Sequence, residues 1–144
     1  MNNMKYLLYI LLIFQFQLST AQYTIKTVPN KKLINNSYVS DPDNYLENYA
    51  IQEINQLCKN LEDSTSAQVA VVVLNSIGAD NPHDFGTRLF NYWGIGQRGI
   101  DNGLLILMIM DQRRVEFITG NGFESVLPDQ LCYCLLYTSD AADE

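Results

Sequence analysis

The sequence is poor in the residues that most often build catalytic and metal centres. It has one histidine, one tryptophan and three cysteines in 144 residues, and 9 basic against 16 acidic residues give a net charge of −7. This negative balance argues against nucleic-acid binding, which requires basic patches. The single histidine, His83, falls in the first turn of a predicted helix with no identifiable partner. A surface position is therefore expected for it, and a Ser-His-Asp triad is not.

The cysteines do not form a metal-binding cluster. Cys134 lies in a C-terminal stretch that we exclude from the fold, which leaves Cys58 and Cys132, too few for a structural zinc site. Cys58 falls on the apolar stripe of a predicted helix, where it would serve as a small buried hydrophobe. In an exported protein the two could instead pair as one disulfide. The sequence leaves both alternatives open.

The N-terminus has the pattern of a signal peptide. Lys5 supplies a positive charge, residues 6–16 form an apolar run, and Ser19-Thr20-Ala21 places small residues before a peptidase cut. The run is too short to span a membrane as a helix. We therefore predict a signal peptide over residues 1–21, a mature N-terminus at Gln22, and export to the periplasm or another extracytoplasmic compartment.

The last residues have a different origin from the rest of the chain. Residues 134–144 match, codon by codon, the translation of a transposase sequencing adaptor. We interpret them as a sequencing scar and leave them out of the fold prediction, as one would leave out a tag. We expect the native gene to continue past Tyr133 into the rest of a helix and then a membrane anchor, so the domain is incomplete here.

Residues 22–133 are about the size of one domain. Residues 22–40 are polar and predict an extended lead-in to a domain over residues 41–133. Apolar spacing then predicts a helix capped by Ser40 or Asp41, a buried strand, a second helix opened by Asn81 and two further strands. These predicted elements cover residues 42–61, 67–74, 82–93, 104–110 and 114–119.

The connections between these elements predict a mixed sheet. The strand, helix and strand over residues 67–110 form a crossover, which makes the two strands parallel, and the short turn at Asp111-Gln112-Arg113 makes an antiparallel hairpin. Helices packed on such a sheet give an α/β fold. If the hairpin is centred on Gln112, Leu104 lies opposite Gly120 and Asp101 opposite Phe123.

Two motifs that suggest phosphate chemistry have simpler explanations. Residues 94–99, Gly-Ile-Gly-Gln-Arg-Gly, match the dinucleotide fingerprint, but they follow a helix and precede a strand, the reverse of the required order. Asp41-Pro-Asp43 has the spacing of a phosphatase nucleophile and acid, but no hydrophobic strand is predicted before it. Helix capping accounts for it better.

The hairpin base gathers acidic residues. The register above brings Asp101, Asn102 and Glu124 to one end of the sheet, with Asp129 a few residues further along. Nearby glycines would let backbone carbonyls approach closely, and such an oxygen-rich set suits calcium or magnesium. Asp101-Asn102-Gly103 also fits an ordinary tight turn, with Glu124 as an acid at a helix start. Both interpretations remain open, and no catalytic residue is assigned.

Several motifs resemble, in order and spacing, those of the TPM domain family, whose members include proteins of the thylakoid, of photosystem repair and of nematode membranes, and the bacterial YgcG-like exported proteins. The motifs are Trp93-Gly94-Ile95-Gly96, Asp101-Asn102-Gly103 leading into residues 104–107, Arg113-Arg114-Val115, Gly120-x-Gly122-x-Glu124 and Leu127-x-Asp129.

The resemblance implies a compact α/β sandwich, divalent-cation binding through loop acids and, for some members, acid-phosphatase activity. Carried onto this sequence, the metal ligands would be Asp101 and Glu124, with Asp129 as a third. The resemblance implies two alternative functions. One is a non-catalytic module that binds or matures membrane protein complexes, and the other is an extracytoplasmic divalent-dependent phosphatase, for which the sequence offers no evident nucleophile.

Overall fold

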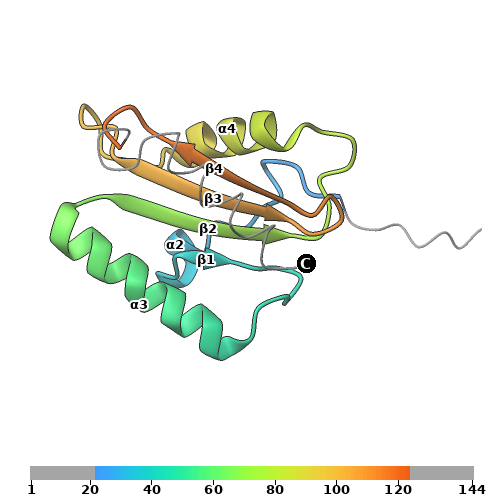
Figure 1. Cartoon of the computed structure of the whole chain (residues 1–144), viewed down its shortest axis with the longest axis horizontal. Coiled ribbons are helices and arrows are strands. Elements are labelled where there is room, and N and C mark those ends of the chain that lie inside the picture. Colours follow the sequence, from blue (N-terminus) through green and yellow to red (C-terminus); the bar gives the residue numbers. More distant parts are fainter. Residues whose placement is uncertain (1–21, 124–144) are drawn as a thin grey trace, which may run out of the picture.

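A computed structural model describes residues 22–123 and shows a four-stranded sheet between helices (Figure 1). The predicted signal peptide, Glu124, Asp129, Cys132 and the adaptor-like stretch lie outside the described residues. The elements, in chain order, are α2 (Lys31–Asn35), β1 (Val39–Ser40), α3 (Asn48–Thr65), β2 (Gln68–Leu74), α4 (Pro82–Trp93), β3 (Gly103–Ile109) and β4 (Arg114–Thr119).

The sheet is mixed, as predicted, with strand order β1-β2-β3-β4. β2 and β3 run parallel and are joined by the α4 crossover, whereas β3 and β4 form the antiparallel hairpin. β1 adds a fourth strand, parallel to β2, at the other edge. The predicted α/β fold, a mixed sheet with helices packed on it, is therefore confirmed.

Helix α4 covers one face of the sheet (Figure 1). Asn81 caps it, as predicted, since its side chain accepts from the backbone N–H of Asp84, and Pro82 occupies the first turn. Phe85 and Leu89 face the sheet and are buried, with Phe90 and Trp93 packed at the margin. Phe85, Phe90 and Trp93 therefore contribute to the core, whereas Tyr92 is exposed.

Helix α3 covers the other face, against β1 and β2. It buries Cys58, which confirms the prediction of a small buried hydrophobe at this position. The helix begins at Asn48 and not at Pro42, so the predicted start was wrong. The reason is that Asp41 accepts hydrogen bonds from the backbone of Tyr45 and Leu46, which closes a turn ahead of the helix.

Residues 22–40 are not extended throughout, contrary to our prediction. They contain α2 and the two residues of β1, and Val28, Tyr38 and Val39 are buried. A five-residue helix and a two-residue strand are too short to leave a periodic pattern in the sequence. This segment is therefore part of the domain.

No helix within residues 22–123 is long and apolar enough to cross a membrane.

Candidate functional site

The predicted cation site is centred on Asp101, which the structure places in the loop before β3. Its side chain is exposed, and its backbone adopts a left-handed φ of 52°. Its carbonyl oxygen accepts a hydrogen bond of 3.1 Å from the N–H of Gly122. The loop ahead of β3 and the turn after β4 therefore meet at this residue, at the amino end of β3.

The hairpin register differs by one residue from the predicted one. Leu104 lies opposite Thr119 and not Gly120, and Asp101 lies beside Gly122 and not Phe123. The cause is the turn, in which the N–H of Arg113 donates to the carbonyl of Met110, so that the hairpin is centred between residues 111 and 112. A shift of one residue exchanges the faces of one strand relative to the other. The predicted register is therefore wrong by one residue, while Glu124, the proposed partner of Asp101, lies outside the described residues.

Asn102 organises the loop that carries Asp101. Its side chain is 7% exposed; Oδ1 accepts from the N–H of Gln97 at 3.0 Å and Nδ2 donates to the carbonyl of Ser66 at 2.9 Å. Gln68 adds a second tie, because its Oε1 accepts from the N–H of Gly96 at 2.8 Å. The Asn102 amide is therefore occupied by the protein and is not available to a cation.

Two glycines after β4 allow the chain to fold onto this loop. A Cβ on Gly120 would overlap the carbonyl oxygen of Asp101, and one on Gly122 would overlap that of Ile100. Only glycine permits backbone contact this close. The glycines thus serve the approach of one backbone segment to another, whereas the sequence suggested that they would let carbonyls approach a cation.

Of the three proposed metal ligands, Asp101 alone lies within the described residues. Asp101 offers a solvent-facing carboxylate, which is the hard oxygen ligand that calcium and magnesium prefer. Within residues 22–123 there is no group of three or more histidine, cysteine, aspartate or glutamate side chains placed to hold a metal. Glu124 and Asp129, the other predicted ligands, lie outside the described residues. The cation therefore remains a prediction that rests on Asp101 and those two acids.

Two acids at the opposite end of the sheet, beyond the carboxyl end of β1, hold loops in place. Asp41 accepts from the backbone of Tyr45 and Leu46, as noted above, and Asp43 accepts from the hydroxyl of Tyr23 and the N–H of Asn75, both at 2.9 Å. The bond from Asn75 fixes the loop after β1 to the loop after β2, and the bond from Tyr23 attaches it to the N-terminal segment. Asp41 closes a turn and does not cap α3, whose N-cap position is Glu47, so the predicted helix capping was wrong.

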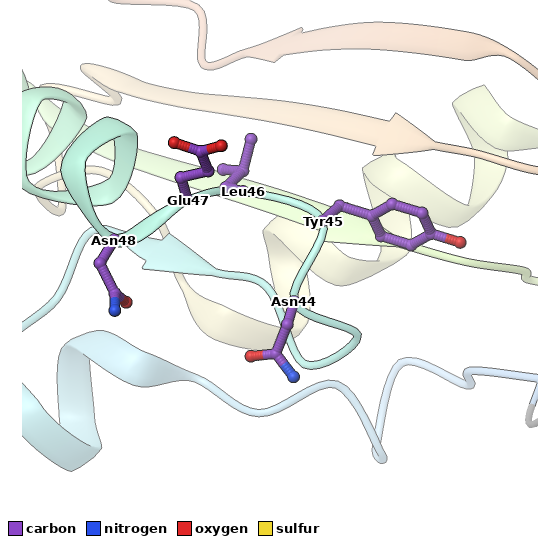
Figure 2. Close-up of a pocket in the computed structure, with 5 residues that line it drawn as sticks. All are labelled: Asn44, Tyr45, Leu46, Glu47 and Asn48. Atoms are coloured by element: carbon purple, nitrogen blue, oxygen red, sulfur yellow. The ribbon is translucent and has the colours of Figure 1, made fainter.

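Two hollows on the described surface differ in character. The first, about 470 Å³, is lined by the loop of residues 44–48, and Figure 2 shows Asn44 and Asn48 pointing to the side opposite Leu46 and Glu47. Because these side chains do not converge, the hollow offers no catalytic arrangement. The second is a groove of about 700 Å³ between α2 and α3. The sequence contains a signal for it that we did not use: Gln52, Asn55 and Gln56 share one face of a helix.

His83 lies on the surface, as expected. Its side chain is exposed, and Nδ1 is 3.5 Å from a carboxylate oxygen of Glu116 on β4. This contact joins the first turn of α4 to the neighbouring strand.

Comparisons with known proteins agree with this architecture. Residues 39–137 match the family model described as the TPM domain. Among solved structures, the chain is similar to the solution NMR structure of the N-terminal domain of a protein from P. gingivalis. The sequence identity is 35% and the TM-score 0.76, and the alignment covers 83% of this chain and 76% of that chain. The comparison with curated proteins gives no match.

Proposed function

Because the chain belongs to the TPM domain family, we propose that it acts as an exported, non-catalytic module that binds or matures membrane-associated protein complexes, with a divalent cation at its acidic loops. The module would work in the periplasm or another extracytoplasmic compartment. Any membrane anchor would follow the domain.

The proposal of a non-catalytic role rests on the hydrogen bonds that the loop carboxylates already accept within the fold. A nucleophile or general base must present its oxygen to a substrate. Asp41 and Asp43, the pair with phosphatase-like spacing, accept four hydrogen bonds from backbone and tyrosine groups of their own fold. Because their oxygens already accept these bonds, the two carboxylates support a role in shaping loops that contact a partner.

The cation part is supported by the solvent-facing carboxylate of Asp101, on a loop held by the two part-buried hydrogen bonds of Asn102. Calcium or magnesium would bind through Asp101, with Glu124 and Asp129 as the further ligands proposed. When bound, the ion would link the loop before β3 to the chain after β4. Its effect would be structural, since it would neutralise the acids there and stiffen the surface offered to a partner.

Calcium-dependent melting of the full-length chain tests the cation. An ion present at a hundredfold its dissociation constant stabilises the folded state by roughly 2.7 kcal/mol. We expect the melting temperature of the wild type to rise with calcium relative to chelator, and the rise to be lost in Asp101→Asn and in Glu124→Gln. Asp111→Asn, an exposed acid beyond the other end of β3, is the matched control and should keep the rise.

A phosphatase assay separates the two family functions. Hydrolysis of p-nitrophenyl phosphate should be absent with calcium, with magnesium and with chelator alike. Turnover that requires magnesium and disappears in Asp101→Asn would establish the alternative, a divalent-dependent phosphatase. If neither calcium nor magnesium changes the melting temperature of the wild type, the cation is removed from the proposal.

A further inference from the structure

We propose that the groove between α2 and α3 binds a neutral oligosaccharide. This groove of about 700 Å³ is distinct from the Asp101 loop and independent of any cation there. One wall is α2 with the turn that follows it, the other is a face of α3 from Ile51 to Asp63, and Tyr38 lies between them. At 1.5 Å per residue that face is about 18 Å long, enough for several sugar rings.

Amide side chains dominate the lining of the groove. Asn36 and Gln52 make no side-chain hydrogen bond within residues 22–123. Asn55, which also lines the groove, uses only its Oδ1, which accepts from the N–H of Tyr38 and the hydroxyl of Ser37; its Nδ2 has no partner among the described residues. Each amide carries two donor hydrogens and an acceptor side by side. The groove therefore presents unfilled donors and acceptors in close succession.

The charged residues of the groove neutralise one another. Lys32 pairs with Glu62 at 3.0 Å, and Lys59 pairs with Asp63 at 2.6 Å. Lys32 also lies over the ring of Tyr38, 3.5 Å from its centroid. The lining thus carries two lysines and two acids in pairs, although the protein as a whole is acidic. An anionic or cationic ligand would have to break one of these pairs, so an uncharged polar ligand fits better.

Sugar hydroxyls match this surface better than a peptide does. Each hydroxyl both donates and accepts, so neighbouring hydroxyls on a ring complement the paired groups of an amide. An extended peptide gains its specificity from pockets that receive side chains. Ile51 is the only aliphatic residue in the described lining, and the Tyr38 ring is covered by Lys32. The groove offers hydrogen bonds without such pockets.

An NMR titration tests this inference. The ¹⁵N-labelled full-length chain is titrated to millimolar concentration with maltohexaose, cellohexaose, laminarihexaose and chitohexaose, and with a glycine-serine hexapeptide. We expect at least one sugar to shift the side-chain amide signals of Asn36, Gln52 and Asn55. The dissociation constant should be about 1 mM, because the described lining of the groove offers no uncovered aromatic ring for stacking. The hexapeptide should leave these signals in place.

A paired variant identifies the groove as the binding surface. Gln52→Ala with Gln56→Ala removes two exposed amides from α3 without touching a buried group, and should weaken sugar binding about tenfold. Asn48→Ala with Asn91→Ala removes two exposed amides elsewhere and should leave it unchanged. The inference is overturned if none of the four sugars binds, if the hexapeptide alone binds, or if both paired variants bind sugar as the wild type does.

Discussion

The side-chain amide of Asn102 donates to the carbonyl oxygen of Ser66 over 2.9 Å, and so joins the loop before β3 to the end of α3. Asn102→Ala would leave that carbonyl and the N–H of Gln97 without their partners. Both bonds are part-buried, so we expect a loss of about 1 to 2 kcal/mol, the net contribution of two hydrogen bonds, in a urea denaturation. Asn91→Ala, an exposed amide on α4, should change stability by no more than about 0.5 kcal/mol. Equal losses in both variants would contradict the role given to Asn102.

The contact of Gly122 with Ile100 predicts a second loss of stability. In Gly122→Ala the new Cβ would meet a backbone carbonyl, which cannot move aside as a side chain can. Overpacking of this kind costs about 1 to 3 kcal/mol. Gly99→Asn is the comparison, because Gly99 has a φ of 84° with open space around it, and asparagine tolerates this region. Thermal melts should show a clear decrease for the first variant and little for the second.

The pair formed by Glu62 and Tyr38 predicts a pH-dependent contribution to stability. The hydrogen bond from the Tyr38 hydroxyl lowers the pKa of Glu62; burial opposes this, and Lys32 reinforces it. A carboxyl whose folded pKa is lowered stabilises the fold above its unfolded pKa, near 4.5, and this contribution is lost as the pH falls through the folded pKa.

Glu62→Gln should therefore be less stable than the wild type at pH 7, by about 1 kcal/mol, with a difference that shrinks in acid. Urea midpoints measured at several pH values provide the check. Glu53→Gln, on the exposed side of α3, should change stability little at any of them. A constant difference between Glu62→Gln and the wild type down to pH 3 would show that the carboxylate is not the cause.

Burial also governs the reactivity of Cys58. Removal from water raises the pKa of its thiol, with nearby Lys32 opposing and Glu62 adding to the shift. Since the thiolate is the reactive form, Cys58 should react slowly with a thiol reagent in the folded protein and rapidly in urea. The measurement requires a variant with Cys132→Ser and Cys134→Ser. Fast labelling of this variant in native buffer would mean that α3 does not hold the residue in the core.

Long periodic elements could be predicted from the sequence. The strand over residues 67–74 and the helix opened by Asn81-Pro82 were placed within a residue of the observed β2 and α4, because a buried apolar run and a capped helix start leave strong local signals. The parallel and antiparallel pairings followed from the lengths of the connections. In contrast, β1 depends on a neighbour distant in sequence, and its two residues carry no pattern of their own.

The candidate site was harder to predict because it depends on register. The hairpin was correctly identified, but its observed centre lies half a residue before the predicted one. As a result, Asp101 lies opposite a residue one position earlier in the chain after β4 than predicted. No composition rule distinguishes a turn centred on Gln112 from one centred just before it. The side-chain bonds of Asn102 to Ser66 and Gln97 are likewise invisible in a sequence, since they join segments that only the fold brings together.

The brevity of β1 has a consequence for motion. Among the described residues, β1 pairs with β2 through Val39 and Ser40 alone. The α2 side of the molecule is therefore attached to the sheet by a short ladder, while α3 stays anchored by its buried face. Local opening starts where few backbone hydrogen bonds must break. We expect amide hydrogens along this edge to exchange with solvent earlier than those of β2 and β3. The α2 wall of the groove would then be the mobile one and the α3 wall the fixed one. A ligand that contacts both walls would slow the exchange of these amide hydrogens by holding α2 in place.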